Sequence, residues 1–99
     1  MKRIGLSGGL SWYSSIEYYR ILNLLTEEHL GAHHQGNIVL VNVNLHEFRT
    51  LLNRDDTSRA IDLLISAAKT LESAGCDLIL LCSNGVHQFF YQVEDSITT

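Results

Sequence analysis

Cys82 is the side chain in this sequence best suited to proton transfer or nucleophilic chemistry. It ends an aliphatic run, residues 77–82, and precedes a segment whose apolar residues have helical spacing. The dipole and the free N–H groups at the start of a helix favour a thiolate, which lowers the pKa of a thiol and raises its reactivity. An unreactive buried thiol that packs as a small apolar side chain is the alternative interpretation.

Ser83 and Asn84 place a hydroxyl and an amide next to that thiol. These groups suit a carboxylate or carbonyl oxygen of a ligand, although Ser and Asn also cap helices whatever the function. The other cysteine, Cys76, follows Gly75 at the opposite end of the same aliphatic run. We therefore interpret Cys76 as a packing residue.

A second group of small polar residues, Gly8-Gly9-Leu10-Ser11, follows the first aliphatic run. Glycines let a ligand approach the backbone closely, and serines at the start of a helix add donors where anions are favoured; Ser14 and Ser15 extend this supply. The loop suits a phosphate or a carboxylate, although a glycine turn before a well-capped helix has the same pattern. The sequence contains neither the Gly-Lys-Ser/Thr end of a Walker A loop nor a Gly-x-Gly-x-x-Gly motif.

The second aliphatic run ends in Asn42 and Asn44, where a dinucleotide-binding protein has an acidic residue for the ribose. After it come His46 and Arg49. A guanidinium pairs bidentately with a carboxylate, so Arg49 is a candidate for substrate binding, with Arg54 as the alternative. Arginines in loops are also commonly just solvated.

Two further groups of histidines need interpretation. His87 lies three residues after Asn84, close enough to influence Cys82, although a packed or exposed helix histidine fits equally. His29, His33 and His34 fall on both sides of Gly31, which breaks any shared helical face. We expect a solvated surface cluster there and no metal site.

The elements that would position these residues alternate in kind. Residues 3–7, 37–43 and 77–82 are short, continuous aliphatic runs, which predict buried strands. Between them, apolar residues recur at helical spacing. We predict a first helix from the Ser-x-x-Glu motif at 14–17 to Gly31, a second from 55–57 to Gly75, and a third from 84–85 through Val93.

This order of strand and helix, repeated three times, predicts an α/β fold with three layers, in which helices cover both faces of a short parallel sheet. The simplest strand order is 2-1-3. The carboxyl ends of the first and third strands then flank a crevice, the usual place for a ligand in such sheets. The two loops rich in small polar residues lie at that crevice, and two strand edges are left free to pair with another chain.

Length and composition restrict the function further. A chain of 99 residues and 11.1 kDa forms one domain, residues 1–99, with a thin core. The net charge of −4 argues against nucleic acid as a partner. No apolar run approaches the ~20 residues needed to span a bilayer, and the start of the chain lacks the apolar region of a secretory signal, so we expect reduced cysteines and a cytoplasmic protein.

Several enzyme classes fail on particular residues. A phosphorelay receiver needs an aspartate at the end of the third strand, where this chain has Cys82. A glutaminase or hydrolase elbow needs glycines on both sides of its nucleophile, and Leu80-Leu81-Cys82-Ser83-Asn84 has neither. Lys2 and Lys69 lie away from the predicted crevice, so we expect no pyridoxal cofactor.

The segment Ile4-Gly5-Leu6-Ser7-Gly8-Gly9-Leu10-Ser11-Trp12, with the Tyr18-Tyr19-Arg20 that follows, resembles the opening of the aspartate racemase family within the aspartate/glutamate racemase superfamily. Leu81-Cys82-Ser83-Asn84-Gly85-Val86-His87 resembles that family's Leu-Cys-Thr-Asn-Thr-Met-His segment, and a weaker likeness runs through His46-Glu47. Leu10, Leu52 and Gly85 depart from residues common in the family. The resemblance covers nearly all of this chain and the first half of a family member.

The resemblance implies a cofactor-independent amino-acid racemase with two related α/β halves of flavodoxin-like fold. Each half supplies one catalytic cysteine, on opposite sides of an acidic amino-acid substrate. It implies that Cys82 is the thiol of the first half and that Ser83 and Asn84 hold the substrate carboxylate. We further expect substrate contacts from Gly9, Leu10, Ser11 and Arg49. The family's second cysteine lies in a Gly-Cys-Thr-Glu-like segment that this chain lacks, so we expect the chain by itself not to racemise.

Two other hypotheses remain open at this stage. The chain could be a non-catalytic domain fragment that binds carboxylates or associates with itself, because half of a family member and a three-stranded sheet leave surfaces for a missing C-terminal domain or for further copies. It could also be a flavodoxin-like binder whose first loop holds a phosphate. The identity of the amino acid is not determined by these residues.

Overall fold

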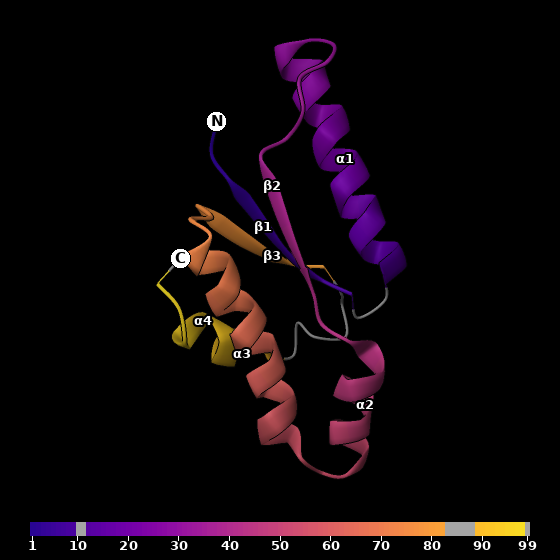
Figure 1. Cartoon of the computed structure of the whole chain (residues 1–99), viewed down its shortest axis with the longest axis vertical. Helices are drawn as coiled ribbons and strands as arrows, with labels where there is room; N and C mark the ends of the chain where they lie inside the picture. Colours follow the sequence, from indigo (N-terminus) through magenta and orange to yellow (C-terminus); the bar gives the residue numbers. More distant parts are fainter. Residues whose placement is uncertain (10–11, 83–88, 99) are drawn as a thin grey trace.

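The structure is a computed structural model that describes residues 1–9, 12–82 and 89–98. In chain order the described elements are β1 (Ile4–Gly8), α1 (Trp12–Leu30), β2 (Ile38–Asn42), α2 (Leu45–Asn53), α3 (Thr57–Ser73), β3 (Leu78–Leu81) and α4 (Phe90–Asp95), as Figure 1 shows. Within these ranges, no helix is both long enough and apolar enough to cross a membrane.

The three strands form one parallel sheet in the order β2-β1-β3, which confirms the predicted fold class and strand order. Ile4 of β1 pairs with Ile38 of β2 and with Leu78 of β3, so all three strands start at the same level. Their carboxyl ends therefore lie together at one edge of the sheet. Figure 1 shows α1 on one side of the sheet and α3 with α4 on the other.

Successive residues of β1 point to opposite faces of the sheet. A Cβ on Gly8 would meet Ser15 of α1, whereas a Cβ on Gly5 would meet Leu71 of α3 and Cys76. One face of the sheet is thus covered by a single helix, and the other by α3 and the elements packed on it.

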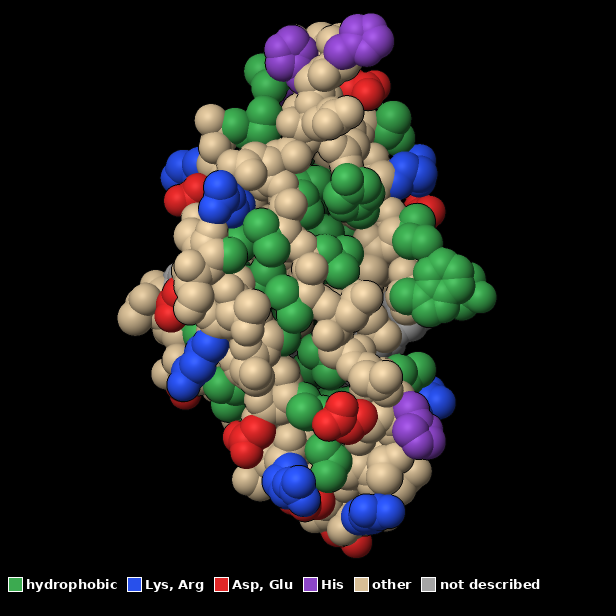
Figure 2. All heavy atoms as spheres, viewed as in Figure 1, with side chains coloured by type: hydrophobic (Ala, Val, Ile, Leu, Met, Phe, Trp, Pro, Cys, Tyr) green, Lys and Arg blue, Asp and Glu red, His purple; other side chains and the backbone are tan. Residues whose placement is uncertain are grey.

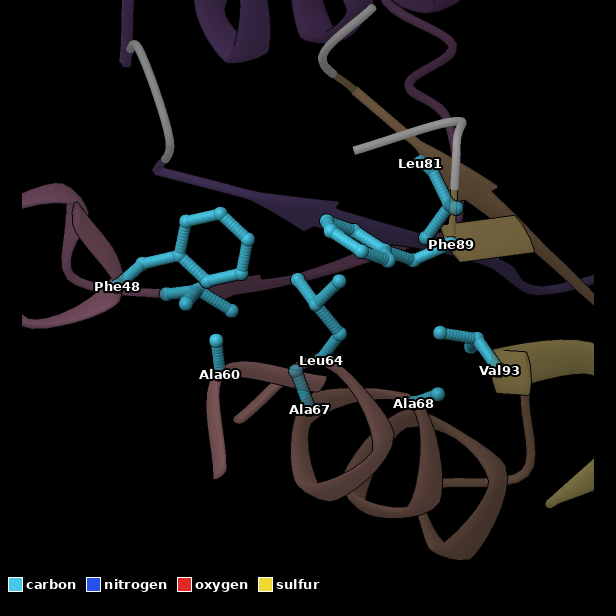
Figure 3. Packing of buried hydrophobic residues seen from close by; sticks show 9 residues of the cluster. Phe48, Ala60, Leu64, Ala67, Ala68, Leu81, Phe89 and Val93 are labelled. Carbon is cyan, nitrogen blue, oxygen red and sulfur yellow. The ribbon is translucent and has the colours of Figure 1, made fainter. Parts of the chain in front are cut away.

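The main hydrophobic cluster lies on the α3 side. Leu64 and three alanines of α3 lie beneath Phe48 of α2 and Phe89, whose rings meet edge to face with centroids 6.1 Å apart (Figure 3). The small side chains let α3 approach the sheet closely, while the two rings fill the space at its carboxyl edge. The buried members of the cluster are Val43, Phe48, Ala60, Leu64, Ala67, Ala68, Leu81, Phe89 and Val93.

Helix ends agree with the sequence in part. Asp56 caps α3, since its side chain accepts from Arg59 N, and Gly31 and Gly75 follow α1 and α3 with φ of 102° and 78°. The predicted first helix starts too late: α1 begins at Trp12, so Ser14 is inside the helix.

Two other helix predictions need comment. Helix α2 was not predicted, although Asn44 and Glu47 show the pattern of an N-terminal cap: the Asn44 side chain accepts from Glu47 N at 3.0 Å. The chain is therefore not a simple threefold repeat of strand and helix. Of the predicted third helix, the described part begins at Phe90, and the predicted start at 84–85 lies outside the described residues.

Arg3 ties the amino ends of all three strands together. Its guanidinium donates to the Ala74 carbonyl, at the end of α3, and to Asn37 Oδ1 at 3.3 Å, just before β2. Its backbone N donates to Asp77 Oδ2 at 2.7 Å, just before β3, and its backbone O accepts from Asp77 N at the same distance. These bonds fix the level at which the strands begin.

Replacing Arg3 with Met should lower the free energy of unfolding by roughly 1–3 kcal/mol, because charged and partly buried hydrogen bonds are lost. Urea unfolding followed by circular dichroism measures the change. Arg59→Met is the matched control: Arg59 forms a long, exposed ion pair with Asp56 at 3.7 Å, so the same substitution there should cost less than ~0.5 kcal/mol. Equal effects of the two substitutions would contradict the role given to Arg3.

Candidate functional site

The carboxyl edge of the sheet brings together residues far apart in the sequence. Val43 N donates to Gly8 O at 2.7 Å, and Cys82 N donates to Ser7 O at 3.0 Å. These two bonds continue the pairing of β1 with both neighbours past the last strand residues. Cys82 therefore lies directly beside the Gly8-Gly9 turn, as the sequence predicted for the two loops of the crevice.

The Gly8-Gly9 turn has no room for side chains. A Cβ on Gly8 would lie 2.2 Å from Ser15 Oγ, and a Cβ on Gly9 would lie 2.8 Å from Val43 O. Gly9 also has a φ of 87°, a conformation that side chains rarely adopt. The turn needs both glycines to join β1 to α1 while it packs against the end of β2.

Ser15 is buried, and its hydroxyl oxygen accepts from Gly9 N at 3.0 Å. This bond ties the first turn of the chain to α1. We predicted from the sequence that Ser15 offers a donor to an anion and that the Gly9 backbone faces a ligand. The structure shows that the Gly9 N–H and the Ser15 oxygen already bond to each other, so the described part of this loop acts first as a support.

Cys82 is buried, with 1% of its surface exposed, and its Sγ lies 3.8 Å from Leu80 O. Burial raises the pKa of the Cys82 thiol from its ordinary value of 9.0 to about 11. The sequence-based expectation of a lowered pKa is therefore wrong for this chain, because removal from water disfavours the thiolate. At neutral pH Cys82 is a thiol, able to donate a proton and not to remove one.

The expected start of the helix that would stabilise a thiolate, at 84–85, lies outside the described residues, and the described helix α4 starts at Phe90. Five residues of the predicted site or its surroundings fall outside the described residues: Leu10, Ser11, Ser83, Asn84 and His87. Of the predicted site residues, the described chain thus places Cys82 and Gly9 at the carboxyl edge, where Cys82 bonds to Ser7 on the β3 side and Gly9 lies against Val43 on the β2 side.

Arg49 lies in α2, which starts directly after the carboxyl end of β2. Its side chain is exposed and forms no ion pair with any residue of 1–9, 12–82 and 89–98. The alternative, Arg54, follows the last residue of the same helix, one turn farther from the sheet. Arg49 is thus a cation near the carboxyl edge that the described chain does not neutralise.

Cys76 lies at the opposite end of β3 from Cys82. It is buried, and its Sγ lies 3.0 Å from the position of a Cβ on Gly5. Burial raises the pKa of the Cys76 thiol. The charge of Arg3 lowers this pKa, and the charge of Asp77 raises it. Six residues of extended chain separate the two cysteines by roughly 20 Å, so Cys76 does not belong to the carboxyl edge.

The histidines at the far end of α1 show no sign of a metal centre. His29, His33 and His34 are exposed, and across the described ranges no group of three His, Cys, Asp or Glu side chains is arranged to hold a metal ion. His46 is exposed in the first turn of α2.

Taken together, these features define an open α/β domain with a parallel sheet and a buried cysteine next to a glycine turn at its carboxyl edge. No family model matches the chain. In fold and sequence it is similar to the crystal structure of a putative Asp/Glu racemase from Yersinia pestis, with 38% identity and a TM-score of 0.91. It is also similar to the crystal structure of an aspartate racemase homologue from Pyrococcus horikoshii OT3, with 29% identity and a TM-score of 0.90.

These matches confirm the resemblance to aspartate racemases inferred from the sequence. They cover 97% and 100% of this chain, but only 42% and 43% of the two solved chains. The chain therefore spans less than half the length of the structures that it matches, and more than half of each has no counterpart here.

Replacing Gly9 with Ala should destabilise the chain by roughly 1–3 kcal/mol more than replacing Gly31 with Ala. Both glycines have positive φ, but a Cβ on Gly31 would meet only the His34 ring, at 3.9 Å, whereas one on Gly9 would clash with the β2 backbone. Thermal and urea unfolding measure the difference. Similar losses at the two positions would mean that the turn is not sterically closed.

The raised pKa of Cys82 predicts how its reactivity depends on pH. In a Cys76→Ser variant, iodoacetamide should modify the folded chain at pH 8 at least ~100-fold more slowly than free cysteine, and the rate should rise toward pH 11. Unfolding in urea should abolish the difference.

The pKa of Cys82 is higher in the folded chain than in the unfolded chain. The buried thiol therefore stabilises the fold fully below about pH 8.5, and this contribution is lost as the pH rises through 11. Fast modification at pH 7 would contradict the assignment.

Proposed function

We propose that this chain supplies one half of the active site of an amino-acid racemase of the aspartate/glutamate type, which works without pyridoxal phosphate. The observation that carries the proposal is the position of Cys82, whose backbone N–H bonds to Ser7 O next to the Gly8-Gly9 turn. The 38% identity to an Asp/Glu racemase structure over 97% of the chain supports it.

The chemistry requires two proton-transfer groups. Inversion at the α-carbon removes a proton from one face and delivers one to the other. A thiolate on the first face takes the α-proton and becomes a thiol, while a thiol on the opposite face gives its proton to the carbanion and becomes a thiolate. The number of protons is conserved, and the roles are exchanged in the reverse direction.

Cys82 enters this cycle as the proton donor. Its raised pKa keeps it protonated at neutral pH, so the partner thiol must start as the thiolate. Cys76 does not provide that partner, since it lies at the amino end of β3. The second thiol therefore comes from a part of the enzyme equivalent to the portion of the solved chains that this chain does not cover.

The remaining roles are assigned from the sequence. Ser83 and Asn84, next in sequence to Cys82, bind the carboxylate of the amino acid, and Gly9, Leu10 and Ser11 supply further contacts to the substrate. Arg49, which the described chain leaves without an ionic partner, binds a substrate carboxylate and thereby favours acidic amino acids. In this proposal residues 1–99 form one domain that corresponds to the N-terminal half of a two-domain racemase.

A second candidate is a domain that binds a carboxylate without turnover. The extent of the match favours it: the chain matches only 42% of the length of the Yersinia pestis structure. In that case the chain would bind dicarboxylates, as measured by calorimetry, but would not exchange their α-proton. Arg49→Met would abolish the binding.

Proton exchange tests the catalytic proposal. L-aspartate and L-glutamate in deuterated buffer are incubated with the chain alone, and with a chimera in which this chain replaces the matching part of the Yersinia pestis protein. The chain alone should give no racemisation, because it has one of the two thiols. The chimera should exchange the α-proton, and Cys82→Ser should reduce that rate at least ~100-fold.

Cys76→Ser in the same chimera is the matched control and should leave the rate within about twofold, because that thiol lies roughly 20 Å away. Circular dichroism establishes that both variants are folded. Complete racemisation by the isolated chain would contradict the need for two thiols. If Cys82→Ser left the rate of α-proton exchange by the chimera unchanged, Cys82 would have no role in the mechanism.

A further inference from the structure

Three consecutive backbone groups at the end of β1 bond to three different elements. Ser7 O accepts from Cys82 N, directly after β3, and Gly8 O accepts from the N–H directly after β2. Gly9 N donates to Ser15 Oγ of α1 at 3.0 Å. The first two bonds join backbone to backbone, so they do not depend on the type of side chain. The third bond depends on one side chain, that of Ser15.

Ser15 lies directly against the turn. It is a buried residue of α1, with 3% of its surface exposed. A Cβ on Gly8 would overlap Ser15 Oγ and would lie 2.9 Å from Ser15 Cβ. The helix therefore reaches the turn only because residue 8 has no side chain, and the Ser15 hydroxyl occupies the place that this glycine leaves open.

We propose that Ser15 is a positioning residue of the racemase site: its hydroxyl oxygen fixes Gly9 relative to Cys82 and thereby controls substrate binding without touching the substrate. This inference rests on the proposed function. The Gly9 N–H is occupied by Ser15, so the substrate contact expected from Gly9 is made by its Cα and its carbonyl group. The position of both groups depends on the orientation that Ser15 gives to the Gly9 N–H.

The bonds of Ser15 and Cys82 act on different steps of the reaction. Cys82 N is held by Ser7 O, and this bond does not involve α1. Loss of the Ser15 oxygen should therefore weaken substrate binding and leave the proton-donating thiol in place, which raises KM and keeps kcat. A loss of folded enzyme would have the reverse effect, because it lowers the apparent kcat and leaves KM unchanged.

Threonine is the conservative replacement at this position. Its hydroxyl oxygen can accept from Gly9 N as that of serine does. Its additional methyl group has room, because Ser15 lines a hollow of about 320 Å³ between α1 and β2, together with Ile16, Tyr19 and Leu40. Figure 2 shows hydrophobic side chains where α1 meets β2, so the methyl group would have apolar neighbours.

Kinetics of the chimera that carries this chain in place of the matching part of the Yersinia pestis protein test the inference. The substrate is L-aspartate or L-glutamate, whichever the chimera racemises. Ser15→Ala should raise KM at least ~10-fold and leave kcat within about threefold. Ser15→Thr should keep both constants within about threefold of wild type.

Thr26→Ala is the matched control. Thr26 also lies in α1, and its side chain also makes one hydrogen bond to the backbone, to Leu22 O at 2.8 Å. That bond stays within the helix and does not reach the turn. Thr26→Ala should therefore leave KM unchanged, and far-UV circular dichroism establishes that all three variants are folded.

Amide hydrogen exchange of the 99-residue chain, followed by NMR, tests the bond itself without any activity. The Gly9 N–H should exchange at least ~10-fold faster in Ser15→Ala than in the wild-type chain, and at the wild-type rate in Ser15→Thr. The Cys82 N–H, which bonds to Ser7 O, should keep its wild-type rate in both variants.

The outcomes separate this inference from the proposed function. An unchanged KM in Ser15→Ala, a fall in kcat alone, an unchanged exchange rate of the Gly9 N–H, or a Ser15→Thr variant as impaired as Ser15→Ala would overturn the role of Ser15 while the racemase proposal stands. A wild-type chimera without α-proton exchange would overturn the proposed function, and the role of Ser15 with it.

Discussion

The parallel pairing of β1 with both of its neighbours is the constraint on which the site depends. Ile4 pairs at the same level with Ile38 and Leu78, so three chain segments that start together also end together. The carboxyl ends of three segments that are distant in the sequence therefore meet at one edge. Cys82 reaches the Gly8-Gly9 turn through this pairing and not through any contact of its own side chain.

The two ends of the sheet have different roles. At the amino end, Arg3 and Asp77 use charged side chains to hold the strands in register. At the carboxyl end, backbone groups bond to each other or to Ser15, and the rings of Phe48 and Phe89 belong to the hydrophobic cluster packed against that end.

Burial gives Cys82 its chemical character. A thiol at the start of a helix would become a better nucleophile, but desolvation acts in the opposite direction and is the cause of the raised pKa here. In the proposed function, a thiol that stays protonated at neutral pH would be the proton donor of a pair. The chain matches less than half of two racemase structures, so the proposal takes the second thiol from the part that the chain does not cover.

Much of this protein follows from local patterns in its sequence. Continuous aliphatic runs at 3–7, 37–43 and 77–82 are enough to predict three strands, and the simplest right-handed arrangement of their connections predicts the order β2-β1-β3. The prediction that all three strands are buried is wrong: β1 is mostly buried, whereas β2 has no buried residue and β3 has only Leu81. Gly31 and Gly75 could be predicted to end helices, because the residue after a helix commonly needs a positive φ. The resemblance around Cys82 and the glycine turn predicted the racemase neighbours for the same reason: the residues of each motif are adjacent in the chain.

Properties that depend on distant neighbours were decided only by the tertiary structure. Helix α2 was missed although Asn44 is a favoured cap, because nine residues are short for a clear helical periodicity. Phe48 becomes a core residue only against Phe89, which lies forty-one positions later in the sequence. The bond between Ser15 and Gly9 requires α1 to lie against the end of β1. The pKa of Cys82 depends on how completely surrounding elements exclude water, and desolvation is a property of packing that no short segment of sequence specifies.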